Sequence, residues 1–180
     1  GTSMKKTLAM VLALTLIALS VAALAEPVKL TENASGFDLT IDLPEGAAVK
    51  VETNDDVPYT FITFADASMP KVYISVAATE EYDPDETLAS LSKDDLDTLF
   101  TTVSEDFDKP SYKLKKTTGG NDYMLVEDDS ATDSALLLML YKGYFIQMTI
   151  WNEDYAVLTD AQTKAAEALL DTVKIVDVAT

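Results

Sequence analysis

Hydrophobic and polar residues alternate along several short stretches in the first half of the chain, which predicts β-strands. The clearest case is Phe37–Leu43, in which every second residue is apolar and the residues between are Asp or Thr. Such alternation is typical of a strand with one buried face. Further strands are expected at Val28–Leu30, Ala47–Glu52, Tyr59–Ala65 and Val72–Ala77. Short turns separate these stretches, so the first half is expected to be an antiparallel meander.

Two segments with helical spacing interrupt this strand pattern. In the first, Ser92 and Asp95 resemble a capping box, in which a side chain at the start of a helix accepts a hydrogen bond from a backbone N–H one turn later. Apolar residues then recur at helical intervals, and Pro110 is expected to end the helix. In the second segment, Thr159 and Gln162 form a capping box before another amphipathic stretch.

Strands return between the two predicted helices, at Tyr112–Lys116, Asp122–Val126, Ala135–Tyr141 and Tyr144–Trp151. The run Ala135–Tyr141 is continuously apolar, which is consistent with a central strand buried on both faces. A last short extended piece is expected at Ile175 and Val176. The order strands, helix, strands, helix predicts an α+β fold, with an antiparallel β-sheet covered by helices on at least one face.

The layout also resembles a known family. The features that carry the resemblance are Phe37–Leu43 followed by Pro44-Glu45-Gly46, the mid-chain helix, the turn Thr117–Gly120, the hairpin Leu138–Ile150 and the terminal helix that runs into Val173–Ile175. Together they resemble the PsbP-like family of small α/β/α sandwich proteins. That family includes a Ran-binding import protein, a photosystem II extrinsic subunit and many exported bacterial proteins of unknown role. The resemblance implies an α/β/α sandwich and a non-enzymatic binding or accessory module, and it carries no functional motif that transfers to named residues.

The N-terminal segment has the pattern of an export signal. Residues 4–25 combine two lysines near the start, a long apolar run, and small residues at the two positions that a signal peptidase reads. We expect cleavage after Ala25, which would release a single α+β domain over residues 26–180 without stable membrane insertion, either periplasmic or extracellular. A retained membrane anchor is the alternative, because the apolar run is close to spanning length. Residues 1–3 precede the start methionine and look like a cloning remnant.

Composition narrows the chemistry. The chain carries 13 basic and 31 acidic residues for a formal net charge of −18, and it has no Arg, His or Cys. The negative charge and the lack of Arg disfavour nucleic-acid binding. Without His, the chain lacks the usual general base near neutral pH, and no serine–histidine or cysteine–histidine pair can form. With neither His nor Cys, it cannot build the ordinary ligand sets for zinc, copper, haem or iron–sulfur clusters. Carboxylate, hydroxyl, lysine and tyrosine chemistry remains, with oxygen-ligated cations such as calcium.

Two acidic clusters are weak candidates for a metal site, one with Asp83 and Asp85 and the other with Asp128, Asp129 and Asp133. Calcium requires oxygen-rich loops, but neither cluster has the glycine and distal glutamate of an EF-hand loop. The alternative is that both are solvated loops of an acidic protein. We expect no cofactor, and bound calcium is the alternative.

Two further features are weak candidates for a partner surface. Lys113 and Lys115 belong to a cluster of lysines that could bind an anionic envelope polymer, or could protect an edge strand against aggregation. Phe145 and Trp151 share one face of the predicted strand Tyr144–Trp151. They could line an exposed groove, or they could pack beneath a helix.

These observations lead to the hypothesis of an exported, non-enzymatic binding or accessory protein of the cell envelope. Its partner would be a protein or another envelope component. Two alternatives stay open: a calcium- or small-ligand-binding module, and a small carboxylate-dependent hydrolase, which would need two acids facing each other across a cleft. No catalytic residues are assigned, and the oligomeric state is not predicted.

Overall fold

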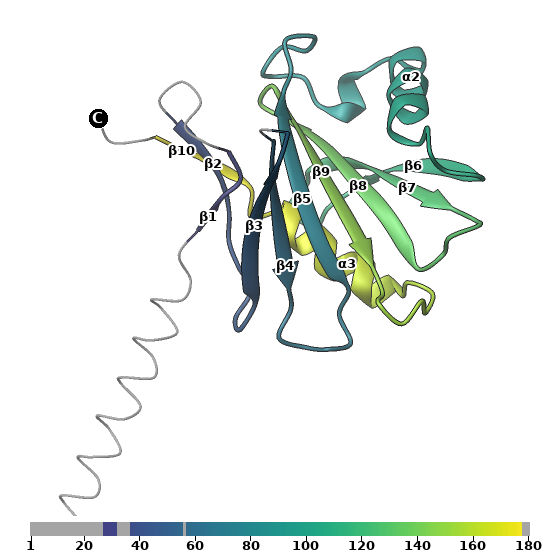
Figure 1. Cartoon of the computed structure of the whole chain (residues 1–180). Helices are drawn as coiled ribbons and strands as arrows, with labels where there is room; N and C mark the ends of the chain where they lie inside the picture. Colours follow the sequence, from purple (N-terminus) through teal and green to yellow (C-terminus); the bar gives the residue numbers. More distant parts are fainter. Residues whose placement is uncertain (1–26, 32–36, 56, 178–180) are drawn as a thin grey trace, which may run out of the picture.

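The computed structural model describes residues 27–31, 37–55 and 57–177 (Figure 1). The predicted export signal at residues 4–25, and the three residues before it, lie outside these ranges. The described part of the chain forms two antiparallel β-sheets and two α-helices. Within it, neither helix has the length and apolar character needed to cross a bilayer.

The larger sheet has seven strands, and every neighbouring pair is antiparallel. In spatial order they are β3 (Ala48–Asn54), β4 (Val57–Thr63), β5 (Lys71–Ala78), β9 (Tyr144–Trp151), β8 (Ser134–Tyr141), β7 (Asp122–Asp128) and β6 (Pro110–Lys116). Each of them was predicted from the hydrophobic pattern, with ends that differ by a few residues. The continuously apolar β8 is an interior strand and is buried on both faces from Ala135 to Leu140, as predicted.

A second sheet of three strands contains β1 (Val28–Lys29), β2 (Phe37–Ile41) and β10 (Lys174–Asp177), in the order β1-β2-β10. Strand β2 therefore pairs with the end of the chain, with Leu39 opposite Ile175. Leu39 and Ile41 are fully buried against the larger sheet. The alternating pattern predicted these strands correctly, but it did not show that they form a separate sheet.

The two predicted helices are present. Helix α2 (Lys93–Val103) follows a short 3₁₀ turn, η1 (Leu88–Ser90), and the Ser92 side chain accepts a hydrogen bond of 3.1 Å from Asp95 N. It ends at Val103, well before the expected stop at Pro110, and Pro110 instead begins β6. Helix α3 (Asp160–Leu170) opens with the predicted capping box.

Two apolar clusters hold these elements together, one on each face of the larger sheet. On the inner face, α3 and the second sheet pack against β4, β5, β7, β8 and β9, with Leu39, Met148 and Leu170 at the centre. On the outer face, η1 and α2 pack against β7 and β8 through Leu88 and Leu96.

The prediction of an α/β/α sandwich is wrong. Strands hold 43% of the described residues and helices 17%. The inner face is covered jointly by α3 and the second sheet. On the outer face, α2 lies over the β6–β8 half, and no helix of the described residues lies over the half formed by β3, β4 and β5 (Figure 1). On the inner face, β2 and β10 bury apolar side chains of the larger sheet that a second covering helix would bury in such a sandwich.

Candidate functional site

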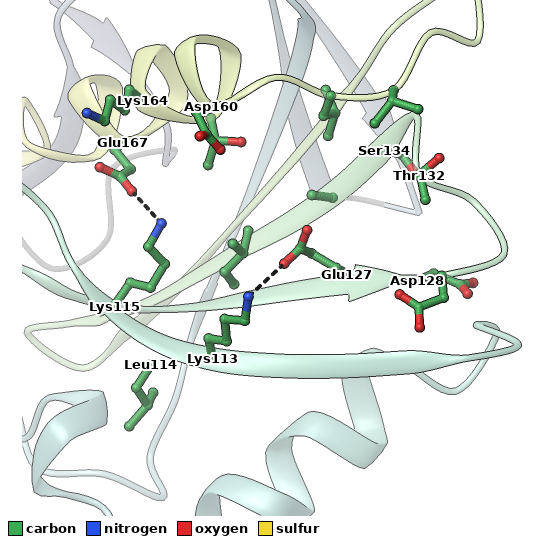
Figure 2. Close-up of a pocket in the computed structure, with 16 residues that line it drawn as sticks. Lys113, Leu114, Lys115, Glu127, Asp128, Thr132, Ser134, Asp160, Lys164 and Glu167 are labelled. Carbon is green, nitrogen blue, oxygen red and sulfur yellow. Dashed lines mark ion pairs between the residues drawn. The ribbon is translucent and has the colours of Figure 1, made fainter.

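A groove of about 690 Å³ opens on the inner face, between helix α3 and strands β6, β7 and β8 (Figure 2). We call it the α3 groove. Its floor includes Leu125 from β7, Ala135 from β8 and Leu158 from the loop before α3. Charged side chains from β6 and α3 stand on its two sides (Figure 2). A hollow of this size is in the usual range for ligand sites, which combine an apolar lining with a few polar groups.

The lysine side of the groove follows from the alternation in β6. Lys113 and Lys115 point to the inner face, and Leu114 between them points the opposite way (Figure 2). Successive side chains of a strand lie on opposite faces, so both lysines enter the same groove. Strand β6 is also an edge of the larger sheet. The alternative interpretation of the lysines, as charges on an edge strand, therefore fits their position as well.

The two lysines are partly neutralised by acids of the groove. Lys115 Nζ lies 3.4 Å from Glu167 Oε1 of α3, and Lys113 Nζ lies 4.0 Å from Glu127 Oε1 of β7. The Tyr123 hydroxyl donates a hydrogen bond to the same Glu167 Oε1. Burial raises the pKa of Tyr123, and the bond to Glu167 raises it further, so the hydroxyl stays protonated and keeps donating. This chain of contacts ties α3 to the β6–β7 end of the sheet.

Two charges of α3 remain available to a ligand. Asp160 and Lys164 are exposed and line the groove. Neither side chain forms a hydrogen bond or ion pair with the residues that the structure describes. The groove thus has an apolar floor and, beside it, one carboxylate and one ammonium group that form no ion pair with the described residues. This arrangement suits a ligand that carries charges of both signs.

Asp128 lies at one end of the groove, but its carboxylate is occupied. It accepts hydrogen bonds from Asp108 N (3.1 Å), Lys109 N (3.0 Å), Ser130 N (3.0 Å) and Ser130 Oγ (2.6 Å). These bonds, those from Ser130 above all, lower the pKa of Asp128 to about 2. The side chain therefore holds together the loop after β7 and the loop before β6. Asp129 also lines the groove, whereas Asp133 does not.

The other acidic candidates lie elsewhere. Asp83 and Asp85 belong to the loop before η1, where the Glu86 carboxylate accepts a hydrogen bond of 2.8 Å from Asp83 N. The described residues include no group of three or more acidic side chains placed to hold a metal ion. The two acidic clusters predicted from the sequence thus form no shared site, and the calcium hypothesis gains no support from the structure.

The two aromatic candidates have different surroundings. Both Phe145 and Trp151 are half-buried on the outer face. Phe145 meets Tyr82 edge to face, with ring centres 5.4 Å apart, and packs against the cluster beneath η1 and α2. For Phe145, the interpretation as a residue packed beneath a helix is therefore the better one.

Trp151 instead joins a row of aromatic rings on the uncovered half of the outer face. Its ring centre lies 5.6 Å from that of Tyr73, which lies 5.7 Å from Phe61 and 6.2 Å from Tyr59. All four side chains are half-buried. Sequence reasoning singled out Trp151 but missed its neighbours, because they lie on β4 and β5 and meet it only through the strand pairing.

The structure thus brings together four of the predicted site residues, Lys113, Lys115, Asp128 and Asp129, in the α3 groove. Sequence reasoning missed the groove residues that α3 supplies. A signal was present, since Asp160, Lys164 and Glu167 are spaced by four and three residues and so share one helix face. Predicting their role required knowing which strands that face meets.

Comparison with known protein-family models and with curated proteins gave no match. The resemblance to the PsbP-like family therefore stays a prediction from the pattern of elements. Function has to be inferred from the geometry of the groove.

Proposed function

We propose that the protein is a non-enzymatic binding protein of the cell envelope, exported through its N-terminal segment, and that the α3 groove binds an extended peptide segment of a partner protein. One observation carries the proposal. The groove has an apolar floor, and it is also lined by the charged side chains of Asp160 and Lys164, which form no ion pair with the described residues. An extended peptide can place apolar side chains on such a floor and charged side chains at its rim.

The charge of the chain adds a further property of the partner. At −18, the protein attracts molecules of net positive charge and repels anionic surfaces. The lining of the groove follows this sign, with five acids and three lysines, but Lys164 pairs with none of the described acids. We therefore expect a partner that is basic overall and that carries at least one acidic side chain within the bound segment, where Lys164 can pair with it.

Two matched substitutions test the role of the groove. Thr163 lines it from α3, and its hydroxyl donates to Thr159 O at 3.3 Å. Thr101 on α2 donates in the same way to Asp97 O, at 2.9 Å, but α2 packs on the outer face and Thr101 does not line the groove. Thr163→Trp would fill the groove, whereas Thr101→Trp adds the same bulk to the other helix.

The full chain and both variants, expressed with the native N-terminal segment, would be used to capture partners from the envelope fraction of the producing cells. Quantitative mass spectrometry should find proteins that are held by the unmodified chain and by Thr101→Trp but not by Thr163→Trp. Capture of the same proteins by Thr163→Trp would refute the groove as the binding site. Failure of the unmodified chain to capture any specific protein would count against the proposed function itself.

A further inference from the structure

Strand β3 is the most exposed strand of the larger sheet. It forms the edge opposite β6, and within the described part of the chain it pairs only with β4; all of its residues from Ala48 to Asn54 are exposed. Val49 and Val51 are 41% and 54% exposed. An edge strand presents backbone N–H and C=O groups that another strand can pair with, and exposed valines add an apolar surface to that edge.

The two edges of the sheet differ in charge. Strand β6 begins with Pro110 and carries Lys113, Lys115 and Lys116, so a second copy of β6 placed beside it would be repelled. Strand β3 has no proline and carries one lysine and one glutamate, Lys50 and Glu52, which form an ion pair of 2.6 Å within the strand. These opposite charges flank Val51 symmetrically.

We infer that β3 pairs antiparallel with β3 of a second copy of this chain, with Val51 opposite Val51 of the partner subunit. In this register, Lys50 lies opposite Glu52 of the partner subunit, and Glu52 lies opposite Lys50 of the partner subunit. The strand is thus complementary in charge to its own reversed copy, which is the condition for a two-fold symmetric interface. This complementarity identifies a second copy as the occupant, because a strand of arbitrary sequence would not match both charges.

The pairing has a structural consequence for the outer face. Residues opposite each other in an antiparallel pair point to the same side, so the outer faces of the two copies would lie on one side of a continuous sheet. Lys50 pairs in register with Phe61, and Glu52 with Tyr59. The aromatic rows of the two copies would therefore extend towards each other across the symmetry axis. The α3 groove lies at the opposite edge of the sheet and stays open in the dimer.

Charge reversals at β3 test the inference. Sedimentation of the full chain, expressed with its native N-terminal segment and purified after export, should show dimers that form as concentration rises. Lys50→Glu and Glu52→Lys should each weaken self-association by about tenfold or more, because each replaces two attractive cross-strand pairs by two repulsive ones. An equimolar mixture of these two variants should restore dimers, since every facing pair is then of opposite charge. The double variant Lys50→Glu/Glu52→Lys should also dimerise.

Lys109→Glu and Glu153→Lys provide matched controls, because both residues are exposed and lie in loops away from β3. They should dimerise as the unmodified chain does, and circular dichroism should show the same fold for all variants. A chain that stays monomeric over the whole concentration range would overturn the inference. So would a dimer that neither single reversal at β3 weakens. Both results are independent of whether the α3 groove captures a partner.

Discussion

Asn152 and Gln162 exchange two hydrogen bonds through their side-chain amides. Asn152 Nδ2 donates to Gln162 Oε1 at 3.0 Å, and Gln162 Nε2 donates to Asn152 Oδ1 at 2.8 Å. Both side chains are buried. Gln162 also accepts from Thr159 N and donates to Ser68 O. One side chain therefore caps α3 and fixes it to the end of β9 and to the loop between β4 and β5.

We predict that Gln162→Leu lowers the free energy of unfolding by about 3 kcal/mol, because it removes both bonds to Asn152 and leaves the buried Asn152 Oδ1 without a donor among the described residues, while Asn152 Nδ2 keeps its bond to Ala156 O. Urea denaturation monitored by circular dichroism measures the loss. Gln147→Leu is a suitable control, since Gln147 is only half-buried on the outer face and its side chain has no hydrogen bond within the described residues. The control should change the stability by less than about 0.5 kcal/mol, and an equal loss in both variants would contradict the role of the amide pair.

A second prediction concerns the turn after β6, which is held by Asp171 at the end of α3. The Asp171 carboxylate accepts hydrogen bonds from Gly119 N (2.9 Å), Asn121 Nδ2 (3.1 Å) and the Thr117 hydroxyl. A Cβ at position 119 would lie 2.7 Å from Asp171 Oδ1. Gly119→Ala should therefore destabilise the protein by about 1–3 kcal/mol, as overpacking does.

A double-mutant cycle distinguishes this clash from a general effect of alanine in the turn. If the carboxylate is what the new methyl group meets, Gly119→Ala should cost less in the background of Asp171→Ala than in the unmodified chain. Thermal or urea unfolding of the four proteins gives the interaction free energy. Strictly additive losses would show that Asp171 is not the group that excludes a side chain at Gly119.

The capping boxes illustrate what the sequence can reveal. Thr159 and Gln162 are three residues apart, so their contact is local and was predicted. The bonds from Gln162 to Asn152 and Ser68 join segments that are distant in the sequence, and no local pattern indicates them. The same limit applies to the fold class. Alternation predicted the strands at Leu39 and Ile175, but their pairing in a second sheet depends on long-range contacts that the pattern does not contain.

In the candidate site, too, local features were predicted from the sequence and long-range contacts were not. The lysines of β6 were predicted as a cluster, because they lie close together in the sequence. Glu167 was not predicted as a site residue, because its contact with Lys115 depends on the packing of α3 on the inner face of the sheet. The charged residues on one face of α3 indicate a polar helix surface. They do not indicate which strands that surface faces.

A third prediction follows from the pKa of Asp128, which its hydrogen bonds lower to about 2 in the folded protein, below the ordinary range of an aspartate. A carboxyl whose pKa is lower in the folded state stabilises the fold above its unfolded pKa, and that contribution is lost as pH falls. Asp128→Asn should therefore lower the melting temperature at pH 5, and the difference from the unmodified chain should shrink as the pH approaches 2. Asp129→Asn is the control, because the neighbouring carboxylate accepts no hydrogen bond within the described residues. A difference that stays constant with pH would contradict the prediction.

A fourth prediction uses Trp151, the only tryptophan of the chain. Because its half-buried ring lies beside Tyr73 on the uncovered half of the outer face, its fluorescence should be intermediate between that of a buried and a hydrated indole, and acrylamide should quench it. Tyr73→Ala should shift the emission to the red by removing one neighbouring ring, while Tyr155→Ala, which alters an exposed loop residue, should not. Emission typical of a fully buried indole, without quenching, would show that something covers this face.

The last prediction separates charge from shape in the α3 groove. Lys164 is exposed and lines the groove, and among the described residues no acid pairs with it, so Lys164→Glu should change the stability by less than about 0.5 kcal/mol. Binding of a peptide partner recovered with the unmodified chain should nevertheless weaken by about fivefold to tenfold, because an attractive contact at the rim becomes a repulsive one. Lys109→Glu makes the same change of charge in the loop before β6, outside the groove. Titration of the recovered partner should give an unchanged affinity for Lys109→Glu; equal affinities for both variants would show that the positive charge of Lys164 does not contribute to recognition.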